Sequence, residues 1–152
     1  MQTGPIRPED RLYKLWGAPK GGLNTKIHAL VNVRSQAIVV ALSGGNQADI
    51  SLAEELTECL PEGSTLIGDK AYDSSTLRQT AVTKGIKTCI PARTNRTTTV
   101  PFSATRYRRR HRVENFFERI KRYRRVATRY DKLAETFLGF VCLAILFSLR
   151  LT

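Results

Sequence analysis

Two acidic residues, Asp69 and Glu114, have the type and setting for metal-dependent chemistry. Asp69 directly follows the short apolar run Leu66-Ile67-Gly68, which predicts a buried strand. Ligand sites gather at the C-terminal ends of strands in open α/β sheets, and an aspartate there can hold a hard cation such as Mg²⁺. Carboxylates that share two Mg²⁺ ions activate water or a 3′ hydroxyl for attack on a phosphodiester. Asp69 and Glu114 are therefore the candidate catalytic residues and the candidate metal ligands.

Each of these acids also has a plain structural interpretation. An aspartate that follows a strand can serve only as a loop or cap residue. Glu114 can balance charge through a helical ion pair with Arg110, as Glu118 can with Arg122. Such a pair stabilises a helix by only about 0.2–0.5 kcal/mol. The residues by themselves leave both interpretations open.

The segment 104–125 predicts one long helix that would position Glu114. At about 100° per residue, Tyr107, Arg110, Glu114 and Lys121 share a face about 60° wide. The apolar residues fall on a separate stripe that faces the core, and they are Val113, Phe116, Phe117, Ile120 and Tyr123. Glu114 and its basic neighbours therefore flank the buried face, where the cations would grip phosphates around the carboxylate.

The charge of the chain is concentrated around this helix. The 152 residues carry a formal net charge of +12, and residues 101–132 hold 12 basic and three acidic residues. Residues 133–152 hold one residue of each sign. Such a block favours a polyanion as partner, with nucleic acid first and an anionic membrane second. Further candidate DNA-binding residues are six more arginines of the block: Arg108, Arg109, Arg112, Arg122, Arg124 and Arg125.

The composition argues against several other classes of protein. The three cysteines lie far apart and form no CxxC motif, so a disulfide scaffold and a structural zinc site are poorly supported, and a reducing, cytoplasmic compartment is expected. The N-terminus has no apolar run typical of a signal peptide. The longest uncharged apolar stretch, 136–149, is shorter than the about 20 residues of a membrane span and predicts a buried core helix.

The remaining elements predict a single α/β domain. Alternating residue types over 23–31 predict a strand with one buried face, which leaves His28 on its more polar side, and 37–42 predicts the second strand of a hairpin. Residues 1–20 are expected to form an irregular lead-in. A helix is predicted over 50–60, with Asp49 as its N-cap, and a second helix is predicted to run to Lys84, with Asp73 or Ser74 as its cap and Gly85 closing it. Strands are predicted over 65–68 and 86–90, a loop over 91–103 and a last helix over 132–150.

Four blocks of this sequence resemble the bacterial insertion-sequence DDE transposases. They are the spacing Tyr107-x2-Arg110-x3-Glu114-x6-Lys121 and the segments 21–28, 68–73 and 125–132. The resemblance implies a ribonuclease-H-like mixed sheet with flanking helices, in which two aspartates and one glutamate meet around two Mg²⁺ or Mn²⁺ ions. By position, Asp69 would be the second acid and Glu114 the third. Tyr107, Arg110 and Lys121 would bind transposon-end DNA near the cleaved phosphate.

The chain departs from the family pattern at two places, and the larger departure is near the N-terminus. The smaller departure is Ala71, which stands where the family often has glycine. The larger one is that the N-terminal part shows no match to the first-acid motif, because Asp10 does not lie on a convincing strand. We therefore expect residues 21–152 to form a partial catalytic domain that misses its first strand, from a truncated or split gene. Such a chain would be inactive or nearly so alone. Expected partners are DNA, a second copy of the chain or an N-terminal transposase fragment, with no membrane.

Three functions remain as alternatives at this stage. The first is a DNA transposase, which cleaves and transfers strands at insertion-sequence ends in the bacterial nucleoid. The second is a non-enzymatic basic DNA-binding protein that modulates transposition. The third is a membrane-surface protein with its basic helix on anionic lipid. Metal dependence and the effect of neutralising Glu114 distinguish the first from the second.

Overall fold

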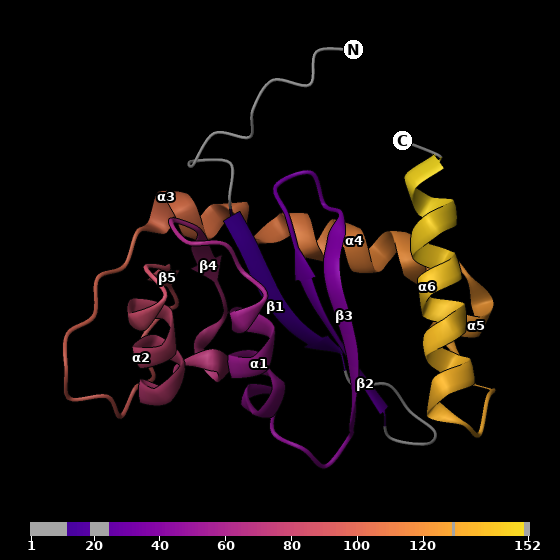
Figure 1. Cartoon of the computed structure of the whole chain (residues 1–152), viewed down its shortest axis with the longest axis horizontal. Coiled ribbons are helices and arrows are strands. Elements are labelled where there is room, and N and C mark those ends of the chain that lie inside the picture. The colour runs from indigo at the N-terminus through magenta and orange to yellow at the C-terminus, as the bar shows by residue number, and fades with distance from the viewer. Residues whose placement is uncertain (1–11, 19–24, 129, 151–152) are drawn as a thin grey trace.

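The computed structural model describes residues 12–18, 25–128 and 130–150 (Figure 1). Within these residues, five strands form one mixed sheet in the order β3-β2-β1-β4-β5. β1 is antiparallel to β2 and parallel to β4, β3 is antiparallel to β2, and β5 is parallel to β4. The strands are β1 (Leu12–Ala18), β2 (Thr25–Val31), β3 (Ala37–Gly44), β4 (Thr65–Ile67) and β5 (Lys87–Cys89).

The central strand β1 corrects the prediction for the start of the chain. Residues 12–18 are not an irregular lead-in, and the sheet does not miss its first strand. Residues 1–11 and 19–20 lie outside the described residues. The local sequence of β1 has no clean alternation and is flanked by prolines. Its pairing with β2 and β4 stabilises it, and such pairing is set by tertiary context more than by local propensity.

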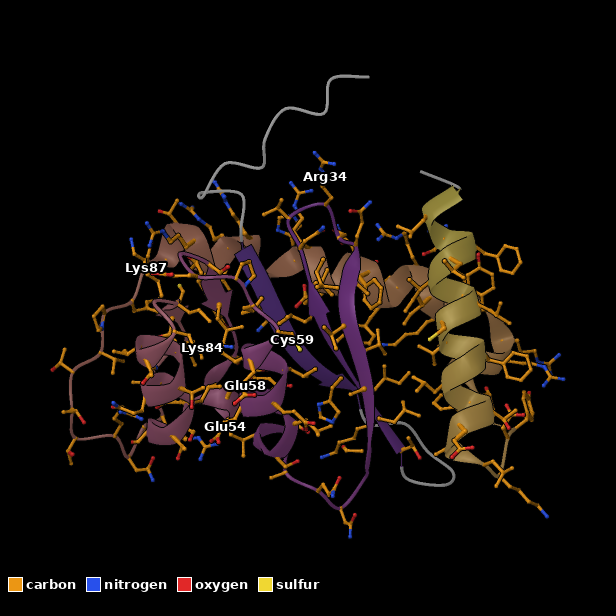
Figure 2. The ribbon with its side chains drawn as sticks, viewed as in Figure 1. Arg34, Glu54, Glu58, Cys59, Lys84 and Lys87 are labelled. Atoms are coloured by element: carbon orange, nitrogen blue, oxygen red, sulfur yellow. The ribbon has the colours of Figure 1, made fainter. Side chains whose placement is uncertain are left out.

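Helices cover both faces of the sheet. The 3₁₀ turn η2 (Asp49–Leu52), α1 (Ala53–Glu58) and α2 (Ser75–Thr83) pack on one face, and Figure 1 shows α4 crossing the opposite face. The second face carries α3 (Ala104–Tyr107), η4 (Arg108–Arg110), α4 (His111–Lys121), α5 (Arg124–Ala127) and α6 (Ala134–Arg150). Lys84 Nζ donates to the Glu58 carbonyl and so joins the ends of α2 and α1 (Figure 2).

The strand β2 is buried on both faces rather than on one. Leu30 belongs to the core under α1 and α2, whereas Ala29 and Val31 belong to the core under α4 and α6. His28 is accordingly fully buried, and its Nε2 lies 2.7 Å from Ser43 Oγ. Burial lowers the pKa of His28, since it disfavours the charged ring, although Asp49 opposes the effect. The prediction of a single buried face for this strand is therefore wrong.

The predicted helix over 104–125 is broken. The 3₁₀ turn η4 interrupts it at Arg108–Arg110, and Tyr123 has an extended backbone that ends it before α5. The ring of Tyr123 lies 6.5 Å from that of Phe147 on α6. The helical spacing of apolar residues continues to Tyr123, so the sequence pattern does not predict that the helix ends there. The end of the helix accompanies packing of Tyr123 against α6.

Local signals predict the ends of α2 correctly but not those of α1. Ser74 Oγ accepts a hydrogen bond from Leu77 N, and Gly85 follows α2 with a φ of +65° that favours glycine. Asp73 is not the cap. Asp49 does not cap the first helix either, because it lies inside η2 and pairs with Lys26 Nζ at 2.9 Å.

The apolar helix α6 is only half buried. Phe137, Val141 and Ala144 belong to the core, whereas Leu146 and Phe147 are 60% and 53% exposed. The prediction of a buried core helix thus holds for one face only. Across residues 12–18, 25–128 and 130–150, no helix has the length and apolar character to cross a membrane.

Candidate functional site

Asp69 follows β4 and begins the 3₁₀ turn η3 (Lys70–Tyr72). Its Oδ1 accepts a hydrogen bond from Ala71 N at 2.8 Å, so the carboxylate caps the turn. Gly68 lies directly before it, and a Cβ there would be 3.3 Å from both Ile90 Cγ1 and Tyr72 Cβ. The small residue lets β4 pass close to its neighbours. The cap interpretation of Asp69 is therefore correct, and its position at the end of a sheet strand is also as predicted.

The sheet directs Asp69 toward the face that carries α4. Val31 pairs with Lys14, and Lys14 pairs with Ile67, so Ile67 faces the side where Val31 contacts α4. Ile67 also packs with Cys89 and Tyr107. The backbone stays extended at Asp69, and side chains alternate along a strand, so Asp69 belongs to the face of Ile67. Asp69 and the helix of Glu114 thus lie on one side of the sheet.

Three of the four signature residues form a contiguous cluster on α3, η4 and α4. Arg110 Nη2 lies 2.6 Å from Glu114 Oε1, and Arg110 Nη1 donates to Tyr107 Oη at 3.2 Å. The hydrogen bond to Glu114, then that to Tyr107, raises the pKa of Arg110. Lys121, two turns further, has its Nζ 5.9 Å from the centroid of the Phe117 ring. Helical spacing therefore correctly predicted that Tyr107, Arg110 and Glu114 meet.

The other basic candidates divide into two groups. Arg108, Arg109, Arg112 and Arg122 are exposed on the surface of η4 and α4. Arg124 and Arg125 are exposed as well, but they contact the C-terminal part of the chain: Arg124 Nε donates to Tyr130 Oη at 3.2 Å, and the Arg125 guanidinium lies 4.4 Å from the centroid of the Phe140 ring on α6. The first group is open to a ligand, whereas the second already makes structural contacts.

The sequence interpretation missed Arg119. Its guanidinium donates to the carbonyl of Ser35, in the turn between β2 and β3. Ser35 has a φ of +58°, and Arg34 extends outward from this turn (Figure 2). Arg119 therefore positions α4 against the hairpin. No local signal marks this contact, since the two residues are 84 positions apart.

A buried cluster around Asp73 was also missed. The Asp73 side chain is 1% exposed, and its two oxygens accept from Arg78 Nε at 2.9 Å, Arg96 Nε at 2.9 Å and Arg93 N at 2.8 Å. Burial alone would raise the pKa of Asp73, but the hydrogen bonds from Arg93, Arg78 and Arg96 outweigh it and lower the pKa. The cluster ties the turn after Asp69 to the loop after β5.

Comparisons with known proteins identify the family of this chain. Residues 66–149 match a family described as "Transposase DDE domain", and residues 6–101 match a second family with the same description. A Brucella ovis protein described as a transposase for insertion sequence element IS6501 is 35% identical over 124 residues, which cover 80% of this chain and 95% of that protein. The chain belongs to the insertion-sequence DDE transposase family.

Solved structures show the fold of this transposase-family chain. The catalytic core domain of BIV integrase superposes with a TM-score of 0.53 at 16% identity, over 90% of this chain and 82% of that chain. A chain of the simian T-cell lymphotropic virus intasome in complex with PP2A regulatory subunit B56 gamma gives a TM-score of 0.53 at 10% identity, over 90% and 47% of the two chains. The predicted ribonuclease-H-like mixed sheet is thereby confirmed.

The first strand of this transposase-family chain is present but carries no acid. β1 has the sequence Leu-Tyr-Lys-Leu-Trp-Gly-Ala. It pairs in parallel with β4, with Lys14 opposite Ile67. The pairing ends there, at the last residue of β4, and Asp69 follows two residues later. The resemblance implies that the family's first acid lies on the first strand, and β1 contains no acidic residue.

The donor set does not fit the two-metal site that the resemblance implies. The family generally uses divalent metal ions. Among residues 12–18, 25–128 and 130–150, no group of three His, Cys, Asp or Glu side chains is placed to hold a metal ion. One oxygen of Asp69 accepts from Ala71 N, and Glu114 pairs with Arg110. Asp69 and Glu114 remain candidate ligands, but no third carboxylate among the described residues is grouped with them.

Proposed function

We propose that this DDE transposase chain binds DNA through α3, η4 and α4, and that it has little or no strand-cleavage activity as a single polypeptide. The observation that supports this proposal is that β1, the central strand next to the strand that leads into Asp69, contains no carboxylate. A phosphodiester clamp that uses two metal ions needs shared carboxylate ligands. With only Asp69 and Glu114, one Mg²⁺ or Mn²⁺ ion would be held weakly at most.

The DNA-binding part of the proposal rests on the exposed cations of η4 and α4. Arg108, Arg109, Arg112 and Arg122 are open to solvent beside the cluster of Tyr107, Arg110 and Glu114. Arginines bind backbone phosphates and release condensed counterions, which makes the affinity depend steeply on salt. This surface therefore suits the backbone of transposon-end DNA, with Tyr107 and Arg110 beside Glu114 and Lys121 two turns further along α4.

A test of the catalytic part is an in vitro cleavage assay with Mn²⁺ and duplex DNA from the end of the insertion sequence. We expect the wild-type chain to bind this DNA but to cleave it no faster than the Glu114→Gln variant. Robust cleavage by the wild type that Glu114→Gln abolishes would contradict the proposal. Binding is measured on the same samples by fluorescence anisotropy, so that inactive protein is distinguished from protein that binds no DNA.

A second candidate function follows from the same observation on β1. A chain that binds insertion-sequence ends without cleaving them would compete with an active transposase and so modulate transposition. Complementation by an N-terminal fragment is less favourable, because β1 already pairs with both β2 and β4 and leaves no gap for another first strand. Addition of this chain to an active transposase on shared DNA ends should lower cleavage if it acts as a competitor.

A further inference from the structure

The loop between β5 and α3 forms a polar pocket that the proposed DNA-binding surface does not include. The pocket has a volume of about 310 Å³, and its lining includes Ser75, Arg93, Asn95, Arg96 and Thr97. Ser75 is the first residue of α2, whereas the other four belong to the loop. Guanidinium, amide and hydroxyl groups therefore converge from two segments on one hollow.

The pocket carries a surplus of positive charge. Asp73 is its acidic lining residue, and the same carboxylate accepts from both Arg78 and Arg96. Arg93 adds a third guanidinium, which donates to the carbonyls of Lys70 and Ala71. The lining thus holds two guanidinium groups, those of Arg93 and Arg96, and one carboxylate, which Arg78 also neutralises from outside the lining. The pocket therefore retains a positive charge that favours an anion.

The hydrogen bonds within the cluster orient the arginines without using all of their donors. Arg96 donates from Nε to Asp73 and from Nη2 to Ser75 Oγ, and Arg93 donates from Nε and Nη2 to backbone carbonyls. A guanidinium has five N–H groups, so each arginine keeps donors beyond these bonds. The Arg96 side chain is only 15% exposed, which limits its freedom and lowers the entropy lost when a ligand binds.

We propose that this pocket binds a backbone phosphate of DNA. Arginine, asparagine, serine and threonine side chains are those that commonly contact DNA phosphates. The pocket is next to the candidate active site, because Arg93 is bonded to Lys70 and Ala71, the two residues after Asp69. The inference rests on the proposed DNA binding and deepens it: a phosphate held here anchors the strand beside the turn that follows Asp69.

The test compares two threonines of the same exposed loop. Thr97 lines the pocket and Thr94 does not, so Thr97→Glu and Thr94→Glu change the net charge equally but place it differently. We expect Thr97→Glu to weaken binding of a labelled DNA duplex about tenfold and to lower the slope of log K against log salt by about one. Thr94→Glu should change the affinity by no more than about twofold. Equal effects of the two variants on DNA affinity would overturn the proposal.

An independent measurement separates failure of the pocket from failure of the proposed DNA binding. Inorganic phosphate is titrated into the isotopically labelled full chain, and the amide resonances of Ser75 and residues 95–98 are followed by NMR. Shifts confined to these residues and lost in Thr97→Glu would support the pocket, even if the chain bound no DNA. An absence of such shifts in the wild type would refute it. If Thr97→Glu lost its native spectrum, Asn95→Asp would take its place in both measurements.

Discussion

The two carboxylates Asp73 and Glu114 are both paired with arginine, yet they differ in every other respect. Asp73 is buried and its oxygens accept from three groups on two segments. The Glu114 side chain is 40% exposed and is joined to Arg110 on the same helical segment. Asp73 therefore fixes tertiary structure, whereas Glu114 is accessible to a ligand from solvent.

The difference shows how burial decides what an ion pair does. An exposed pair of this kind contributes about 0–1 kcal/mol, because water screens the charges and both side chains lose freedom. Such a pair opens easily when DNA or a metal ion approaches. A buried carboxylate with all donors in place leaves uncompensated charges if it is removed, and the penalty is large. Glu114, whose ion pair is the weaker of the two, is therefore the one that we propose to bind a ligand.

The largest expected effect comes from breaking the Asp73 cluster. Asp73→Asn removes the charge that holds Arg78 and Arg96, and we expect the free energy of unfolding to fall by about 3 kcal/mol. Urea unfolding followed by circular dichroism measures this loss. Asp49→Asn, which affects a more exposed pair with Lys26, is the matched control and should cost less than about 1 kcal/mol. A loss below that value for Asp73→Asn would contradict the structural role of the cluster.

The pH dependence of stability sharpens the same comparison. The pKa of Asp73 is lowered in the folded chain, so its contribution is fully present above the unfolded pKa of about 4 and is lost as pH falls through the folded pKa. The stability difference between wild type and Asp73→Asn should be constant from about pH 5 to 7 and shrink below about pH 4. Urea midpoints of both proteins across this range measure the difference. A gap that stays unchanged at the lowest pH would show that the charge of Asp73 is not what stabilises the cluster.

The smallest expected effect on stability comes from Glu114. Glu114→Gln should change the free energy of unfolding by less than about 1 kcal/mol, because the pair with Arg110 is exposed. The same variant removes a negative charge from the basic surface, so DNA affinity should stay equal or rise by a few-fold. Anisotropy titrations at fixed salt measure the affinity. A loss greater than about tenfold would instead indicate that Glu114 holds Arg110 in the orientation that binds DNA.

Local features of the fold were predictable from the sequence. Ser74 and Gly85 mark the ends of α2 because capping and positive φ depend on the residues themselves. Tyr107, Arg110 and Glu114 meet because residues three and four positions apart are neighbours on a helical surface. The position of Asp69 directly after a strand follows for the same reason, since the strand and the acid are adjacent in the chain.

The sequence by itself therefore determined the family, the fold class and the local cluster around Glu114. Only the tertiary structure decided that residues 12–18 form the central strand, that His28 is buried and that Asp73 joins Arg93 and Arg96 from 20 and 23 positions away. These features depend on contacts between distant segments, whose formation is governed by burial and by pairing partners that no local pattern encodes. The absence of an acid on β1 has meaning only because the sheet places that strand beside β4, which leads into Asp69.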